Sequence, residues 1–172
     1  MTRAVLSIGS NVGDSYAHLH SVTSALGDRV VAVSSVYSSV PWGGVEQQDF
    51  LNAIVVADDD RRGPYDWLEV ALELEKAADR VRVERWGPRS LDVDIITCAD
   101  ISSNDPQLLL PHPRAHQRAF VLVPWLEVDP EATLEVAGEA RPVGEWIESL
   151  SEEERAGVHR TEMTLHTPNS TS

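Results

Sequence analysis

A short run with two aspartates carries the clearest chemistry in this sequence. Residues 91–96 read Leu-Asp-Val-Asp-Ile-Ile. Because side chains alternate between the two faces of a strand, Asp92 and Asp94 emerge on one face, opposite Leu91, Val93 and Ile95. Neighbouring carboxylates suit a hard cation such as Mg²⁺, which keeps part of its water shell and is usually completed by substrate phosphates. The pattern therefore predicts a magnesium site shared with a phosphate-bearing substrate.

Positive charge suited to such a substrate lies just upstream, at Arg80, Arg82, Arg85 and Arg89. The planar guanidinium group can contact a phosphate through two hydrogen bonds at once. Trp86, Gly87 and Pro88 interrupt this basic run with a loop that sets an aromatic ring beside the arginines. The alternative is a solvated acidic strand face with surface ion-pair partners, which requires no function.

Composition favours a cytoplasmic enzyme of one domain. The chain has 172 residues, 42% of them hydrophobic, and a net charge of −14 from 28 acids and 14 bases. Such a surface should repel nucleic acid and anionic membranes, so neither is expected as a partner. Residues 80–118 depart locally from this negative charge, because they contain six bases and five acids. The single cysteine, Cys98, cannot form an internal disulfide, and no apolar run reaches transmembrane length. The N-terminus becomes a strand too early for a signal peptide.

Hydrophobic periodicity and turn residues predict an alternation of strands and helices. Strands are expected at 4–8, 30–40, 50–57, 91–96 and 108–110. Helices are expected from Asp14 or Ser15 to Gly27, from Pro64 to about Asp79, and at 145–150, with a short apolar element at 121–126. The order β-α-β-β-α-β predicts an α+β ferredoxin-like sandwich, with helices on one face of a mainly antiparallel sheet. Residues 1–163 are expected to form the domain and 164–172 a flexible polar tail.

Phe50 and Asn52 are two residues apart in the third predicted strand and so share a face. An aromatic ring that can stack and an amide that can form hydrogen bonds, on one face, would suit a flat heterocyclic ligand.

Two other motifs are weaker. Residues 9–13 look like a phosphate loop but lack the Gly-Lys-Ser/Thr that would follow, so a structural turn is expected there. His112 and His116 have zinc-pair spacing, but Pro111 and Pro113 argue against a helix. His112 is more plausible as a hydrogen-bond donor to phosphate, given Arg114 and Arg118 nearby.

Taken together, these motifs resemble the 6-hydroxymethyl-7,8-dihydropterin pyrophosphokinase family of the folate pathway, whose members move a pyrophosphoryl group from ATP to a pterin alcohol. The matching segments run in order over about residues 4–130. They are Gly9-Ser10-Asn11-Val12-Gly13-Asp14, Tyr37, Pro41-Trp42-Gly43, Phe50-Leu51-Asn52, Glu75, Arg80-Val81-Arg82, Arg85 to Ile95, Pro111-His112-Pro113-Arg114 and Arg118-Ala119-Phe120-Val121-Leu122.

The resemblance implies a ferredoxin-like fold, a monomer, ATP as co-substrate and two Mg²⁺ ions held by Asp92 and Asp94. Arg80 and Arg82 would belong to a mobile loop that closes over the reactants. The catalytic residues implied are Arg80, Arg82, Arg89, Asp92 and Asp94. The ATP-binding residues implied are Glu75, Arg82, Trp86, Arg89, Ile95, His112 and Arg118. The pterin-binding residues implied are Ser39, Val40, Trp42, Phe50, Asn52, Asp92 and Phe120, with Phe50 and Phe120 on either side of the ring.

Three positions depart from the family pattern: Asp79 replaces a frequent glycine, Val40 a frequent proline and Leu72 a glutamine that can face the nucleotide.

Two other classes of function stay open. A magnesium-dependent nucleotide phosphohydrolase would use the same acids and arginines with water in place of the alcohol. A non-catalytic ligand-binding module is also compatible, because fold does not fix function.

Overall fold

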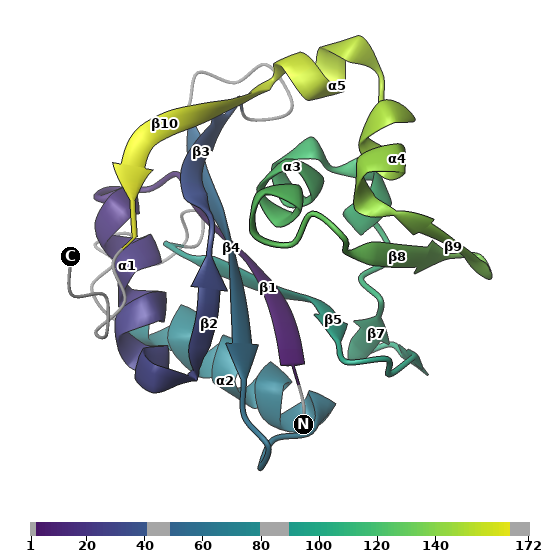
Figure 1. Cartoon of the computed structure of the whole chain (residues 1–172). Helices are drawn as coiled ribbons and strands as arrows, with labels where there is room; N and C mark the ends of the chain where they lie inside the picture. The colour runs from purple at the N-terminus through teal and green to yellow at the C-terminus, as the bar shows by residue number, and fades with distance from the viewer. Residues whose placement is uncertain (1–2, 41–48, 80–89, 166–172) are drawn as a thin grey trace.

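A central antiparallel sheet organises the computed structural model, which describes residues 3–40, 49–79 and 90–165 (Figure 1). Its strands run in the order β10-β3-β4-β1-β5, with β2 also paired to β4, and every pairing is antiparallel. The sheet strands are β1 (Arg3–Ser10), β2 (Val30–Val33), β3 (Ser35–Ser39), β4 (Phe50–Asp58), β5 (Asp92–Cys98) and β10 (Val158–Thr164).

The helices are α1 (Ser15–Leu26), α2 (Pro64–Asp79), α3 (Ala119–Val128), α4 (Val143–Glu148) and α5 (Glu152–Ala156), with 3-10 turns at Gly27–Arg29 and Ala115–Gln117. Two small hairpins add β6 (Ser103–Asp105) with β7 (Leu108–Leu110), and β8 (Thr133–Val136) with β9 (Glu139–Pro142). The sequence β1-α1-β2/β3-β4-α2-β5 and the spatial order β3-β4-β1-β5 confirm the predicted ferredoxin-like α+β fold.

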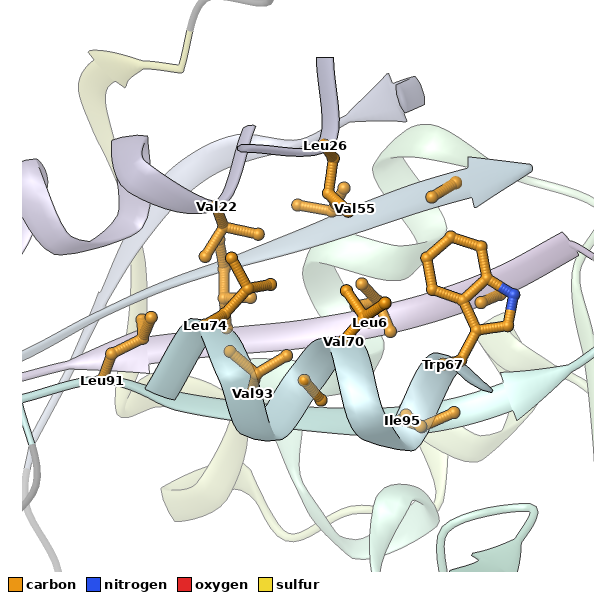
Figure 2. Packing of buried hydrophobic residues seen from close by; sticks show 14 of the residues in the cluster. Leu6, Val22, Leu26, Val55, Trp67, Val70, Leu74, Leu91, Val93 and Ile95 are labelled. Atoms are coloured by element: carbon orange, nitrogen blue, oxygen red, sulfur yellow. The ribbon is translucent and has the colours of Figure 1, made fainter. Parts of the chain in front are cut away.

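Helices α1 and α2 cover one face of the sheet (Figure 1). Buried residues of α2 recur at three- and four-residue spacing, at Trp67, Val70, Ala71, Leu74 and Ala78. Figure 2 shows Trp67, Val70 and Leu74 directed at Leu6, Val93 and Ile95 of the sheet. Trp67 is fully buried, and Cys98 is a buried free thiol.

Helix α3 covers the opposite face, so the expectation of helices on one face only was wrong. The cause lies in the strands, where alternate residues are apolar on both faces: Leu6 points to α2 and Val5 to α3. Val5, Ile54 and Ile96 pack with Val121, Leu122 and Trp125 in this second core. The apolar element predicted at 121–126 is part of this helix, which contains Pro124 and is apolar around most of its circumference.

Two further segments differ from the sequence prediction. The strand expected over 30–40 is split at Ser34, whose backbone N–H donates to the Ile54 carbonyl while its hydroxyl accepts from the Ile54 N–H. This side chain takes the place of a main-chain partner, which breaks the regular ladder. The tail predicted from residue 164 also begins too early, because Thr164 ends β10 and Leu165 is buried in the core. Residues 166–172 lie outside the described part.

Glu127, near the end of α3, fastens this helix to β3. Its carboxylate accepts hydrogen bonds from the Ser35 N–H at 2.9 Å, the Ser35 hydroxyl at 3.1 Å and the Tyr37 hydroxyl at 2.6 Å. Burial alone would raise the Glu127 pKa, but these hydrogen bonds and the charge of Arg160 outweigh it and lower the pKa. Burial, and then the bond to Glu127, raises the pKa of Tyr37 to about 12.

We therefore expect Glu127→Ala to lower the free energy of unfolding by about 1–2 kcal/mol at neutral pH, since donors on β3 lose a charged acceptor. Because the folded-state pKa of Glu127 is depressed, its stabilisation is present above the ordinary value of 4.5 and is lost as pH falls through the folded-state pKa. Urea unfolding at pH 7 and at pH 4 measures both effects. Glu131→Ala, an exposed acid just after α3, is the charge-matched control; equal losses in the two variants would contradict this role.

Candidate functional site

The candidate site is built on one row of residues across three adjacent strands. Gly9 of β1 pairs with Asn52 of β4 on one side and with Asp92 of β5 on the other. Directly paired residues in an antiparallel sheet point to the same face, so Asn52 and Asp92 emerge together with only a hydrogen atom between them at Gly9. The amide expected to bind a heterocycle and a carboxylate expected to bind metal are thus neighbours.

Residues two positions along each strand extend this row on the same face. On one side of it, Phe50 pairs with Ser39 of β3. On the other side, Ser7 pairs with Asp94 of β5 and with Ile54 of β4. From there on the same face of the sheet becomes apolar, at Ile54, Val5 and Ile96 under α3. The sheet face therefore divides into an apolar end that anchors α3 and a polar end that it leaves open.

A cavity of about 1390 Å³ lies over the polar end. Its wall includes residues from the sheet, from the start of α3 and from the segment around α5. The lining residues are Ser7, Gly9, Ser39, Val40, Phe50, Asn52, Asp92, Asp94, Arg114, Gln117, Arg118, Phe120, Ser151, Glu153, Glu154, Gly157 and Val158. Eight residues predicted from the sequence meet in this space: Ser39, Val40, Phe50, Asn52, Asp92, Asp94, Arg118 and Phe120.

Asn52 is held in one orientation by its neighbours. The residue is 3% exposed, and its side-chain amide nitrogen donates to the Ser39 hydroxyl at 2.7 Å. A Cβ atom at position 9 would lie 3.0 Å from the Asn52 side-chain oxygen, which would have to move by a few tenths of an ångström. Gly9 therefore allows close approach within the sheet, a role beyond the loop turn that the sequence suggests.

Arg118 lies between Asp94 and Phe120 in the cavity wall. Its guanidinium group lies 3.9 Å from the Asp94 carboxylate and 5.5 Å from the centre of the Phe120 ring. The side chains of Arg118 and Asp94 are 27% and 43% exposed, so this ion pair is solvent-screened. A phosphate contact through Arg118 would lie between the carboxylates and the aromatic ring.

His112 lies close to the same charges. Burial lowers its pKa, Asp94 raises it, and Arg118 and Arg114 lower it, with a net downward direction. The Arg114 backbone N–H donates to the ring Nδ1 at 3.2 Å. An Nδ1 that accepts leaves Nε2 as the ring donor in the neutral tautomer, which suits hydrogen bonding to a phosphate oxygen.

Three residues predicted to bind the nucleotide, Glu75, Ile95 and His112, are not part of the cavity wall in the described chain. They lie along the outer edge of β5 or behind it. The Glu75 carboxylate accepts from the Val93 N–H at 3.0 Å, and the His112 N–H donates to the Ile96 carbonyl at 2.8 Å. The Ile95 side chain is buried in the core against α2, so it does not face the cavity. Leu72, which departs from the family pattern, is exposed on α2.

The predicted residues Trp42, Arg80, Arg82, Arg85, Trp86 and Arg89 fall outside the described residues. The positions that flank the arginine segment are joined, because Asp79 at the end of α2 accepts from the Ser90 N–H at 3.1 Å. Ser10 in turn donates its hydroxyl proton to the Ser90 carbonyl at 2.6 Å. Asp79, which departs from the family pattern, thus has a local role: it holds Ser90, two residues before β5 begins at Asp92.

Sequence reasoning missed several residues of the cavity wall. Strand alternation alone could have found Ser7, which is two residues from Gly9 in β1. No comparable signal identified the wall at Ser151, Glu153, Glu154 and Gly157, which comes from far along the chain.

Across residues 3–40, 49–79 and 90–165, no cluster of three or more His, Cys, Asp or Glu residues could hold a metal. None of the helices in these ranges has the length and apolarity of a membrane span.

Comparisons with known proteins agree with this geometry. The family model described as 7,8-dihydro-6-hydroxymethylpterin-pyrophosphokinase (HPPK) matches residues 5–130. A 2-amino-4-hydroxy-6-hydroxymethyldihydropteridine pyrophosphokinase of Mycobacterium tuberculosis is 51% identical over 167 residues, covering 92% of this chain and 89% of that protein. The Methylorubrum extorquens enzyme of the same name is 42% identical over 166 residues, covering 94% and 100% respectively.

Solved structures support the fold. A crystal structure of a Plasmodium falciparum HPPK-DHPS triple mutant with pteroate superposes with a TM-score of 0.67 at 13% identity, covering 92% of this chain. A second HPPK-DHPS structure from that organism, with pterin and p-hydroxybenzoate, gives a TM-score of 0.65 at 15% identity. The chain spans less than half of those two proteins, 46% and 47%. On the family match and the full-length relatives, this chain belongs to the 7,8-dihydro-6-hydroxymethylpterin pyrophosphokinase family.

Proposed function

We propose that the cavity over β1, β4 and β5 carries the reaction of this family, with the pterin at the Asn52 side and the ATP phosphates at the Asp92 side. The chain is an ATP-dependent pyrophosphokinase of folate biosynthesis. It transfers the pyrophosphoryl group of ATP to 6-hydroxymethyl-7,8-dihydropterin and releases AMP. The observation that carries the site assignment is the pairing of Gly9 with both Asn52 and Asp92.

The pterin pocket uses the flat and polar groups of the cavity. Phe50 and Phe120 supply faces for stacking, and buried Asn52 supplies an oriented amide. Ser39 orients that amide through the 2.7 Å bond, and Val40 lines the same space. Trp42 is proposed here as a further pterin contact from the family resemblance alone.

Asp92 and Asp94 fit Mg²⁺ by the chemistry of their donors, because both are carboxylates on one face of the cavity. Two carboxylates leave most of an octahedral shell to water and substrate phosphates, and two ions could share the pair. When bound, Mg²⁺ would neutralise phosphate charge and orient the triphosphate and the pterin hydroxyl.

Arg118 binds the phosphates from the start of α3, and His112 binds them from the outer edge of β5. Arg118 offers a fork of N–H donors between the carboxylates and Phe120, and His112 offers its Nε2–H. Arg80, Arg82 and Arg89 are proposed to add positive charge around the transferring group, with Trp86, Glu75 and the main chain of Ile95 near the nucleotide. These roles follow the family resemblance.

In the reaction, the pterin hydroxyl oxygen forms a bond to the β-phosphorus of ATP. The bond from that phosphorus to the oxygen shared with the α-phosphate breaks, AMP leaves, and the hydroxyl proton is released. Such transfers ask little covalent help from a protein, so catalysis comes from positioning and from neutralising charge on the phosphate oxygens. We propose further that the enzyme acts as a cytoplasmic monomer on these small molecules.

A direct assay tests the function. We expect AMP to form from ATP and Mg²⁺ only when the reduced pterin alcohol is present, because the alcohol is the acceptor. Chromatographic separation of AMP, ADP and inorganic phosphate, with and without the pterin, measures this. Release of phosphate or AMP from ATP alone would instead indicate a phosphohydrolase, and binding without turnover would indicate a ligand-binding module.

A second test addresses the metal carboxylates. Asp92→Ala or Asp94→Ala should lower kcat by about 1000-fold or more, a barrier increase of roughly 4 kcal/mol. The fold should persist, because each change also relieves repulsion between the two carboxylates. Steady-state kinetics at saturating Mg²⁺ measure the effect, with Asp100→Ala, an exposed aspartate just after β5, as the matched control. Turnover within about tenfold of wild type would refute the assignment.

A third test separates the two halves of the cavity. Phe50→Ala and Asn52→Ala should weaken pterin binding by about 1–3 kcal/mol, through lost stacking area and a lost buried hydrogen-bond partner. Binding of a non-hydrolysable ATP analogue with Mg²⁺ should change little. Titration calorimetry on each ligand decides the matter: if nucleotide affinity falls as far as pterin affinity, these residues support the fold rather than the pterin.

A further inference from the structure

The segment that follows the family match builds one wall of the cavity. The match ends at residue 130, while Ser151, Glu153, Glu154, Gly157 and Val158 all line the cavity. Figure 1 shows α5 at the rim of the molecule, between α4 and the start of β10. Because β10 pairs with β3, the chain must cross from the α3 side to the far edge of the sheet, and α5 lies on this path.

One side chain of α5 reaches the first residue of α3. The Glu154 carboxylate accepts a hydrogen bond from the Ala119 N–H at 3.1 Å. Arg118, the residue that precedes α3, makes no capping bond with its own side chain. A carboxylate at the start of a helix satisfies a free N–H group and interacts favourably with the helix dipole. Glu154 therefore serves as the cap of α3 from 35 residues away in the chain.

Glu154 is itself held in place. Its backbone N–H donates to the Ser151 hydroxyl at 3.1 Å, the bond that caps α5. Ala119 is fully buried, so its N–H has little access to water as an alternative partner. The contact thus joins two fixed points, rather than a mobile surface side chain and an exposed backbone group.

Ala119, the first residue of α3, lies between two residues that line the cavity. Arg118 precedes it and points to Asp94, and Phe120 follows it and stacks under the Arg118 guanidinium group. The direction in which both side chains leave the backbone depends on where the first turn of α3 starts. Glu127 fixes the other end of this helix on β3. The N-terminal end relies on Glu154 in the same way.

We propose that Glu154 is a positioning residue that sets Arg118 and Phe120 through the Ala119 N–H, so that the segment beyond residue 130 completes the pterin and phosphate site. This inference rests on the proposed function, because it assumes that Phe120 stacks on the pterin and Arg118 contacts phosphate. Glu154 acts through the backbone and has no chemical role in the transfer.

Three variants test this role. Glu154→Ala removes both the charge and the acceptor, Glu154→Gln removes the charge but keeps an oxygen acceptor, and Glu152→Ala removes a charge from the same helix at a solvent-exposed position. Comparing Ala with Gln at position 154 isolates the hydrogen bond from the general effect of charge near bound ATP. The measurements are hydrogen exchange of the Ala119 amide, dissociation constants of the reduced pterin alcohol and of a non-hydrolysable ATP analogue with Mg²⁺, and kcat.

We expect Glu154→Ala to speed Ala119 exchange about tenfold and to weaken pterin binding about five- to tenfold, in line with the loss of a charge-assisted bond at a helix start. Glu154→Gln should restore pterin binding to within about threefold of wild type, and Glu152→Ala should match wild type. Binding is measured well below the unfolding temperature of each variant, so that reduced stability alone does not register.

The outcomes separate this inference from the proposed function. If wild type binds the pterin and Glu154→Ala binds it equally well, or if Gln at 154 behaves like Ala while Ala119 stays protected, the positioning role is overturned. A drop in thermal stability with unchanged pterin affinity also overturns it, because the contact would then be structural only. If wild-type protein binds no pterin, the proposed function itself fails.

Discussion

The antiparallel register of β1 between β4 and β5 is the constraint on which the rest of this structure depends. It sets Gly9 opposite both Asn52 and Asp92, and it sets Ser7 opposite Asp94. A shift of one residue in either pairing would turn a strand's polar set to the opposite face and disperse the site. The register is strongly determined because the alternate residues of these strands, among them Leu6, Val55 and Val93, fill the core under α1 and α2. The same apolar burial that stabilises the fold therefore aligns the functional groups.

The second face of the sheet shows how one surface can be both core and site. Val5, Ile54 and Ile96 bury their side chains under α3, whereas residues two positions along the same strands line the cavity. Helix α3 closes the apolar end and presents Arg118 and Phe120 to the open end, so its placement decides the shape of the cavity. Carboxylates hold it from two directions, Glu127 onto β3 and Glu154 from α5. A helix with an apolar surface all round has little intrinsic preference for one rotation, and directional hydrogen bonds supply it.

Local patterns predicted the parts of the site that lie within one strand. Alternation was enough to place Asp92 with Asp94 and Phe50 with Asn52, and the helix at 64–79 was evident from its spacing and from Pro64. Contacts between distant segments left no such trace. Nothing near Glu154 indicates that it meets Ala119, and the split at Ser34 depends on a hydroxyl bond to another strand. Strand β10 was not predicted for a related reason, because a polar strand gains its stability from pairing, here with β3, rather than from its own side chains.

The charges of the cavity bear on the proposed binding of a triphosphate by a strongly acidic protein. Asp92 and Asp94 would repel it, and net charge of −14 adds to that repulsion. Arg118 offsets Asp94 at 3.9 Å, a distance and an exposure at which an ion pair contributes only about 0–1 kcal/mol. Replacing this weak pair with carboxylate–metal and arginine–phosphate contacts therefore costs little, whereas a tight, buried pair would have to be broken first. In the proposed site, the weakness of this pair leaves Asp94 available to a metal and Arg118 available to phosphate. The contacts of Glu127 and Glu154 hold α3, and with it Arg118, beside the cavity.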